Sequence, residues 1–227
     1  NGTITVVASG GVGVLKYSKD GGANWVTNNG SFGNLPGGTY QIRVANNDES
    51  CVVSFPDVTL TDKIAPVIAN IAKTNPTDCG VNDGTITITA SSGQGSIEYS
   101  INGGGSWQPS NFFAGLGGVN SPYDIRVRNI DGTCEVTGAA QIITDKVQPT
   151  ITNVTPANPS NCGVNDGEII IAATGGATTQ YSIDGGTNWQ ASGTFSNLGA
   201  GTYNLAVRNT DQSCFNLYIT NPVIQLY

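Results

Sequence analysis

The sequence contains no histidine and no methionine, and only 11% of its 227 residues are charged. Acid–base catalysis needs titratable groups that converge in a cleft, and nucleophilic catalysis needs a nucleophile beside a base. The chain has no histidine to serve as that base, and none of its serine, cysteine or glutamate residues lies in a known nucleophile motif. We therefore expect a protein that is not an enzyme and that carries no cofactor.

Positive charge is also scarce, since nine Lys and Arg stand against sixteen Asp and Glu, for a net charge of −7. Binding to nucleic acid requires clustered cations that neutralise phosphates, and so does attachment to an anionic membrane surface. No apolar run approaches the ~20 residues of a membrane-spanning helix. We expect neither a nucleic acid partner nor insertion into a membrane.

What the chain has in abundance is glycine, with 31 residues, together with threonine, serine and asparagine. A hydrophobic content of 38% is too high for a disordered chain, which combines low hydrophobicity with high net charge. Helix-forming residues are few and turn-forming residues are many, so the composition predicts an all-β protein.

The sequence repeats itself three times with a period of about 82 residues. Trp25, Trp107 and Trp189 mark the period, within the strings YSKDGGANW, YSINGGGSW and YSIDGGTNW. The repeat predicts three modules, at residues 1–62, 63–145 and 146–227, of which the first lacks its first strand. This frame leads us to expect a window onto a longer array.

Each module is predicted to contain about seven short strands separated by turns, as in a small β-sandwich. In the second module the expected strands are residues 68–72, 85–90, 96–101, 106–108, 123–129 and 134–144. Tyr40, Tyr123 and Tyr203 follow a turn at the start of the penultimate strand, which is typical of the tyrosine corner of sandwich domains. We therefore predict tandem immunoglobulin or fibronectin III-like modules. Pro66 and Pro149 in the short connectors favour an extended rod.

Four segments of the repeat resemble a known family. These are C-G-x-N-D-G-x-I-x-I, Y-S-I-D-G-G-x-x-W, L-x-x-G-T-Y and a late cysteine, and together they are similar to the SprB-type repeats of Bacteroidota surface proteins. The resemblance covers nearly the whole chain. It implies a secreted cell-surface adhesin of the gliding-motility kind, exported by the type IX secretion system. The family supplies no catalytic residues.

The five cysteines suggest disulfides in an oxidising, extracellular setting. Pairing within modules is the favoured hypothesis, with bonds Cys79–Cys134 and Cys162–Cys214 and the partner of Cys51 upstream of Asn1. Such pairs would have to cross the length of a strand, roughly 20 Å for six residues, so the loop after Cys79 would need to fold back. A bond from Cys79 to Cys214 across the module junction is the alternative, and free thiols are a third. A zinc site is not expected, because histidine and C-x-x-C pairs are absent.

Two further sets of residues are candidates for ligand binding. Trp25, Trp107 and Trp189 could stack against sugars, although packing of each ring beside its glycine turn is the favoured interpretation. Calcium is a weaker candidate ligand, and its oxygens would come from the glycine-turn and N-D-G loops. The residues concerned are Asp83, Asp166 and Asp184, with Asp20 and Asn102 at related positions. Calcium takes six to eight oxygens, so a turn-forming role explains these residues better, and no metal is predicted.

The sequence therefore predicts an extracellular structural or adhesive repeat array at a bacterial cell surface. Its expected partners are neighbouring repeats or copies of itself, and surface polysaccharide or matrix is a further candidate. A stronger form of this hypothesis is a fibre in which another chain supplies the first strand of the first module. The alternatives are a carbohydrate-binding array that uses the three tryptophans, and a passive spacer in a larger secreted protein.

Overall fold

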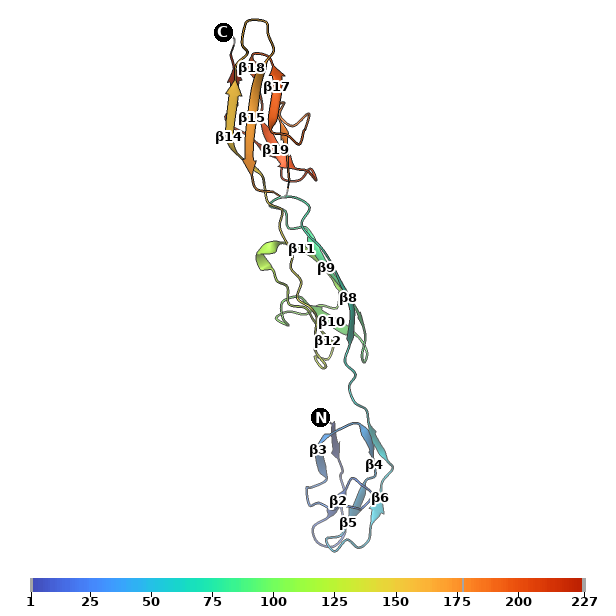
Figure 1. Ribbon diagram of the computed structural model, residues 1–227. Coiled ribbons are helices and arrows are strands. Elements are labelled where there is room, and N and C mark those ends of the chain that lie inside the picture. The colour runs from blue at the N-terminus through green and yellow to red at the C-terminus, as the bar shows by residue number, and fades with distance from the viewer. Residues whose placement is uncertain (1, 177, 226–227) are drawn as a thin grey trace. The chain divides into compact units, whose positions relative to one another are not determined.

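The computed structural model describes residues 2–176 and 178–225, and it divides into two compact units. Unit 1 is Asn1–Ile64 and unit 2 is Ala65–Tyr227. Both units are built from short antiparallel strands, which Figure 1 shows as arrows, and the described residues contain no α-helix. The chain is thus all-β, as its composition predicts. The finer module boundaries at 62/63 and 145/146 stay a prediction.

Unit 1 is a sandwich of short strands whose inner side chains form one core. Its strands are β1 (Gly2–Thr5), β2 (Lys16–Ser18), β3 (Ser31–Leu35), β4 (Gly38–Tyr40), β5 (Arg43–Ala45), β6 (Val53–Ser54) and β7 (Val58–Leu60). They pair as β1-β3, β2-β5-β6 and β4-β7. The core between them consists of Ile4, Val6, Tyr17, Phe32, Leu35, Ile42 and Val44.

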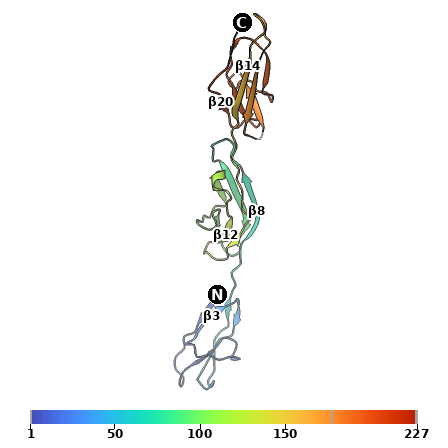
Figure 2. The same cartoon turned by 60° about the vertical axis from the view of Figure 1, so that its left-hand side comes forward.

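Unit 2 contains two sandwiches in sequence, which we call the middle sandwich (β8–β13) and the last sandwich (β14–β21). The strands of the middle sandwich are β8 (Val67–Thr74), β9 (Gly84–Ser91), β10 (Ile97–Ser100), β11 (Phe112–Leu116), β12 (Arg126–Asn129) and β13 (Val136–Thr137), with a 3-10 turn at Gly118–Asn120. Its two sheets have the orders β11-β9-β8 and β10-β12-β13. Figures 1 and 2 both show β8 on one side of this sandwich and β12 on the other.

The last sandwich repeats this plan. Its strands are β14 (Thr150–Ala157), β15 (Gly167–Thr174), β16 (Thr179–Ser182), β17 (Thr194–Leu198), β18 (Gly201–Thr202), β19 (Ala206–Asn209), β20 (Asn216–Leu217) and β21 (Val223–Ile224). They form the sheets β14-β15-β17, β16-β19-β20 and β18-β21. The chain is therefore a tandem series of immunoglobulin-like β-sandwiches, as predicted.

The alternation of threonine and isoleucine along β9 explains why this strand forms. Ile86 and Ile88 are fully buried, while Thr85 and Thr87 are partly exposed and Thr89 is exposed. Side chains of a strand point alternately to the two faces of the sheet, so period-two hydrophobicity places one row in the core. The counterpart residues Ile169 and Ile171 of β15 are buried in the same way.

The tyrosine corner is confirmed in every repeat. The hydroxyl of Tyr40 donates to Pro36 O at 2.7 Å, that of Tyr123 to Gly117 O at 2.9 Å, and that of Tyr203 to Gly199 O at 2.8 Å. Each bond links the tyrosine to a backbone carbonyl four to six residues upstream, in the turn that precedes it. The hydrogen bond thereby holds the turn in place next to the tyrosine.

The predicted strands differ from the observed ones at four places. The expected strand 106–108 is reduced to the isolated bridge between Gln108 and Tyr99, and the expected strand 123–129 covers only Arg126–Asn129, after isolated bridges at Tyr123 and Asp124. The segment 134–144 was expected to be one long strand, but β13 covers only Val136–Thr137 and the chain pairs again at the isolated bridge between Gln141 and Tyr123. The strand β11 at Phe112–Leu116 was not predicted, because its sequence FFAGL does not alternate and Gly115 has a positive φ of 75°. It pairs with β9 through an irregular register, which a two-residue period cannot reveal.

Candidate functional site

The most distinctive site is the joint between the middle and last sandwiches of unit 2. Two loops meet there, the one between β8 and β9 and the hairpin between β19 and β20. Asp83 shapes the first loop. Its carboxylate accepts a hydrogen bond from the backbone N–H of Thr77 at 2.8 Å and a second one from the Thr77 hydroxyl. In the hairpin Asp211 accepts from Ser213 N at 3.1 Å. Side-chain acceptors of this kind fix tight turns, so both loops are ordered locally.

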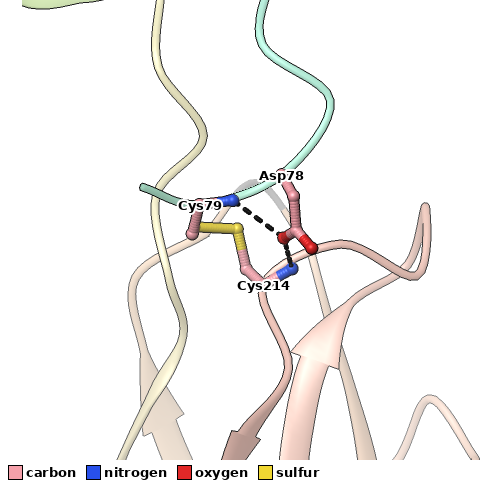
Figure 3. A group of neighbouring side chains, drawn as sticks. All are labelled: Asp78, Cys79 and Cys214. Carbon is pink, nitrogen blue, oxygen red and sulfur yellow. Dashed lines mark hydrogen bonds between the residues drawn. A yellow bond between two sulfur atoms is a disulfide. The ribbon is translucent and has the colours of Figure 1, made fainter. Parts of the chain in front are cut away.

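A disulfide between Cys79 and Cys214 joins the two loops, as Figure 3 shows. The Cα atoms are 5.0 Å apart although the residues are separated by 135 positions in the sequence. The favoured sequence hypothesis of pairing within modules, Cys79–Cys134 and Cys162–Cys214, is therefore wrong, and the alternative across the junction is correct. The physical reason is distance. Cys79 lies in the β8–β9 loop at the end of the middle sandwich that adjoins the last sandwich, and so it is within bonding distance of Cys214.

Asp78 binds the backbone on both sides of this disulfide. Its Oδ1 accepts from Cys79 N at 2.7 Å and from Cys214 N at 2.5 Å, and the dashed lines of Figure 3 mark both bonds. Hydrogen bonds to an ionised acceptor are among the stronger ones in proteins. One carboxylate thus orients both half-cystines. These three residues are also the one cluster among the described residues with the composition of a metal site, but both sulfur atoms are used in the disulfide.

The connector that leads into β14 is held against the last sandwich by side chains. Lys146 forms an ion pair with Asp211, and Asn209 Nδ2 donates to Val147 O at 3.2 Å. Further along, Asn216 Nδ2 donates to Pro149 O at 2.9 Å. Backbone carbonyls of a connector are usually left to water, so these amide donors fix its path.

The same connector is tied to the middle sandwich. Thr144 N donates to Asn75 Oδ1 at 3.1 Å, and Cys79 Sγ lies 3.3 Å from Lys146 O. The joint therefore combines one covalent bond with polar contacts from both sandwiches. On the chain-entropy account, a bond that closes a loop of this length stabilises the folded state by about 5 kcal/mol.

The ion pair at the joint shifts the pKa of Asp211. Hydrogen bonds from Lys146 and then from Ser213 lower the pKa of Asp211 from 3.8 to about 2. The carboxylate is therefore charged at any ordinary pH. Because both side chains remain substantially exposed, the pair contributes positioning more than stability.

Three cysteines occupy the same late position of their repeats and share an unusual backbone. Cys51, Cys134 and Cys214 have positive φ values of 53°, 56° and 60°. Each follows the same turn, in which an aspartate accepts from the amide two residues on. Left-handed backbone is costly for a residue with a side chain, so its recurrence at all three positions indicates that this turn is a conserved part of the repeat's geometry within this chain. Cys51 is an exposed thiol and Cys134 a half-buried one, while Cys162, at the early position of the last sandwich, is exposed.

The three tryptophans pack beside their own glycine turns. A Cβ added at Gly104 would lie 3.3 Å from Trp107 Cζ2, and Trp189 Nε1 donates to Gly186 O at 2.8 Å. Arginines cover one face of two rings, with Arg128 Cζ 3.9 Å from the Trp107 centroid and Arg208 Cζ 4.3 Å from that of Trp189. Trp25 is half-buried in the same position. Stacking of sugars on these rings stays the less favoured alternative.

The candidate calcium residues serve as acceptors within their loops. Asp166 accepts from Ser160 N at 2.7 Å and from its hydroxyl at 2.6 Å, as Asp83 does from Thr77. Asp184 accepts from the hydroxyl of Ser182 at 2.7 Å and from Asn188 N at 2.9 Å, and these donors, Asn188 first, lower its pKa to about 2. Calcium binding by these carboxylates stays the less favoured alternative.

A buried serine lies at the centre of each glycine turn, and the sequence reasoning above did not predict its role. Ser18, Ser100 and Ser182 are fully buried. Ser100 Oγ donates to Asn102 Oδ1 at 2.8 Å and accepts from Gly104 N at 3.0 Å. The signal was present in the recurring string Y-S-x-D/N-G-G, where the serine always precedes the turn residue by two positions. The serine hydroxyl provides hydrogen-bond partners for the polar groups inside the turn.

Comparisons with known proteins agree with this repeat structure. Residues 71–106 match the SprB repeat, and residues 180–191, which contain the glycine turn of the last sandwich, match the BNR/Asp-box repeat. A search of curated proteins returned no match. The SprB match includes β9 and the early loop with Asp78 and Cys79. It supports the resemblance to SprB-type repeats over this part of the chain.

Solved structures of tandem immunoglobulin domains are similar at low identity. Sidekick-1 immunoglobulin domains 1-5 are 12% identical with a TM-score of 0.40, and the match covers 94% of this chain and 54% of that one. Domains 3-5 of the extracellular part of Drosophila OTK are 13% identical with a TM-score of 0.29, covering 93% and 84%. The chain therefore spans about half the length of the Sidekick-1 fragment.

The disulfide bears on where the protein acts. A disulfide persists in oxidising compartments and is rare in the reducing cytosol. Within the part of the chain that is described, no helix has the length and apolarity needed to cross a membrane. Together with the SprB match, the disulfide points to a secreted or surface protein.

Proposed function

We propose that this chain is part of an extracellular structural or adhesive array in which consecutive repeats are joined covalently. The observation that carries the proposal is the Cys79–Cys214 disulfide, which links two neighbouring sandwiches and not two strands of one sandwich. A bond inside a module would stabilise that module alone. A bond between modules maintains the connection under load or local unfolding, which is a property of a supporting element.

The surroundings of the bond support the same function. Asp78 orients both half-cystines, and the ion pair of Lys146 with Asp211 holds the connector beside them. Such contacts position one repeat on the next. The finer role proposed here is that of a bacterial cell-surface adhesin connected with gliding motility and type IX secretion, and it follows from the resemblance to SprB-type repeats.

The test is to locate the native protein and its disulfide together. Antibodies against the chain should label intact, unpermeabilised cells, and brief proteolysis of those cells should remove the label. Peptide mapping of the released material without reductant should recover the peptide pair that contains Cys79 and Cys214. Labelling that requires permeabilisation, or a native protein whose Cys79 is reduced, would overturn the proposal. Imaging the released material would also test the predicted rod.

A further inference from the structure

A groove of about 710 Å³ lies on the middle sandwich. Three segments line it, which are the glycine turn after β10, the strand β11, and the loop from β11 to β12. Its polar lining residues are Asn102, Ser106, Gln108, Asn120, Tyr123 and Asp124. Ligand sites are typically clefts of this size in which a few polar groups stand within apolar surface.

The loop from β11 to β12 is longer in this repeat than in the other two. Six residues separate the leucine from the corner tyrosine in the string LGGVNSPY, whereas four do so in LPGGTY and LGAGTY. The longer loop contains the 3-10 turn Gly118–Asn120, which Figure 1 shows as a short coiled ribbon. It places Asn120 and Pro122 in the groove wall. This wall is therefore a feature that the other two repeats do not share.

Hydrogen bonds hold the longer loop in place. Gly118 N donates to Asp145 Oδ1 at 2.6 Å, and Ser121 N donates to Gly118 O at 3.0 Å. Ile143 N donates to Ser121 Oγ at 2.9 Å. A wall that is already fixed loses little conformational entropy when a ligand binds to it, so the groove is organised for binding in advance.

The glycine turn supplies the second wall. Asn102 Oδ1 accepts from Ser106 N at 2.9 Å, and Asn102 Nδ2 donates to Ser106 Oγ at 2.9 Å. The Ser106 hydroxyl accepts in this contact and can donate its own hydrogen. Gln108 Nε2 donates to Ser110 O and to Phe112 O, each at 3.0 Å, which uses both of its hydrogens. A ligand at Gln108 must therefore donate to Oε1.

Asp124 is the one charged side chain among the described residues that line the groove. Its carboxylate accepts from Arg126 Nε at 3.2 Å and from Arg126 Nη2 at 3.1 Å. An ionised carboxylate has about four acceptor positions, so it can accept further hydrogen bonds from a ligand. A phosphate or carboxylate ligand would meet this negative charge and no lysine or arginine in the lining. The groove therefore favours a neutral ligand.

Gly115 keeps one end of the groove open. It has a φ of 75°, and Asn34 and Asn197, at the same position in β3 and β17, have φ values of 55° and 60°. The three repeats thus share this backbone conformation, but the middle repeat has no side chain here. A Cβ added at Gly115 would meet only Asn82 O, at 3.9 Å. The space that an asparagine side chain would take is therefore unfilled in the middle sandwich.

We propose that this groove binds a neutral saccharide. Sugar hydroxyls both donate and accept, and the groove offers partners for both: Gln108 and Asp124 supply acceptors, and Ser106 supplies a donor. Asn120 supplies both, and the exposed ring of Pro122 provides apolar surface for the C–H groups of a pyranose. The inference deepens the adhesive part of the proposed function by naming a ligand class, and it rests on that function for its biological meaning.

The test is titration of the full chain with defined tetrasaccharides. Neutral tetramers of glucose, mannose and galactose are compared with the tetramer of galacturonic acid. At least one neutral tetramer should bind saturably at one site per chain, and the uronic acid tetramer should bind about tenfold more weakly. In NMR spectra the amide shifts should change in residues 101–108 and 113–124.

Three outcomes of this titration would overturn the proposal. The first is that no neutral tetramer binds. The second is that the uronic acid tetramer binds with equal or higher affinity. The third is that the shift changes centre on the equivalent glycine turns at residues 20–26 and 184–190, which have no longer loop beside them.

Variants of the groove wall locate the site. Gly115→Asn introduces the residue that the other two repeats carry at this position, so the fold should tolerate it, and it should weaken binding about tenfold by filling the groove. Asn120→Ala removes an exposed amide and should weaken binding about fivefold. Asn47→Ala, at an exposed asparagine of unit 1, is the matched control and should bind like the parent chain. Unchanged affinity of Gly115→Asn and Asn120→Ala would overturn the proposal.

A change of selectivity separates binding from a merely structural effect. Asp124→Asn introduces the residue that stands at the same position in the last sandwich, Asn204, and removes the negative charge. It should bring the affinity for the uronic acid tetramer close to that for the neutral one. All these measurements use the isolated chain and do not depend on its cellular location. This proposal and the array function can therefore fail separately.

Discussion

Cys79 and Cys214 lie with their Cα atoms 5.0 Å apart, and their disulfide connects the entry loop of one sandwich to the exit hairpin of the next. The bond closes residues 79–214 into a covalent loop. Once the sandwiches unfold, tension applied to the ends of unit 2 passes through the disulfide, and residues 80–213 are bypassed. This relationship turns two small domains into one covalently closed element.

Breaking this bond should lower the stability of unit 2 substantially. We expect the double variant Cys79→Ser and Cys214→Ser to lose about 2 to 5 kcal/mol of unfolding free energy, because the unfolded chain regains the entropy of a long open loop. Chemical denaturation under oxidising conditions measures this loss. Cys134→Ser, at a half-buried thiol outside the bond, is the control and should change little. Equal stability of all three proteins would contradict the expectation.

The same bond should limit extension under force. Residues 80–213 span about 450 Å when extended, at about 3.4 Å per residue. In single-molecule pulling from both ends, the oxidised chain should lack this length, and reductant should restore it. Unfolding of unit 1 serves as an internal control, since it should appear in both states. Full release of the length without reductant would show that the bond does not carry the load.

The ion pair at the joint predicts a specific pH dependence. Asp211 has a pKa lowered from 3.8 to about 2, with the hydrogen bond from Lys146 as the largest cause. A depressed folded-state pKa contributes stability that is present above about pH 4 and is lost as the pH falls towards 2. Asp20 and Asp184, with pKa values also lowered to about 2, contribute in the same window.

Comparison of the parent chain with Lys146→Gln isolates the pair from these other carboxylates. The difference in unfolding free energy between the two proteins should be constant above pH 4 and should shrink towards pH 2. A pH-denaturation series at low salt measures it, since salt screens exposed pairs. A difference that does not change with pH would exclude a contribution from the pair.

The tyrosine corner of the middle sandwich should be measurable by a single substitution. Tyr123→Phe removes a buried hydroxyl and leaves Gly117 O without its donor, so it should lower stability by about 1 to 2 kcal/mol. The same change at Tyr40, where the bond is exposed, should cost less. Peptide-level hydrogen exchange reports each sandwich separately. A larger effect at Tyr40 than at Tyr123 would contradict the role of burial.

The tryptophans provide a test of the carbohydrate-binding alternative. With Arg128 covering one face of Trp107, we expect no polysaccharide binding that depends on this ring. Glycan-array binding by the parent chain that disappears in a folded Trp107→Ala variant would reverse this conclusion. The thermal unfolding curve of the variant provides the folding control, since loss of the ring's packing should lower its midpoint.

Local features of the fold were predictable because they depend on neighbouring residues. The alternation along residues 85–90 predicted β9, and a tyrosine after a turn predicted the bonds of Tyr40, Tyr123 and Tyr203. The strand β11 could not be found in this way, since its glycine-interrupted sequence forms a strand only because β9 offers it an edge. Pairing between distant segments is not encoded in a two-residue period.

The sequence by itself determined that this is a three-fold repeat, that its repeats are all-β sandwiches, and which residues recur in each of them. Only the tertiary structure decided that Cys79 binds Cys214 rather than Cys134, and that residues 112–116 form the strand β11 on the edge of β9. The physical reason is distance. Spacing along the chain fixes which residue types are available, whereas a disulfide or a strand pair forms between groups that the packed sandwiches bring within reach.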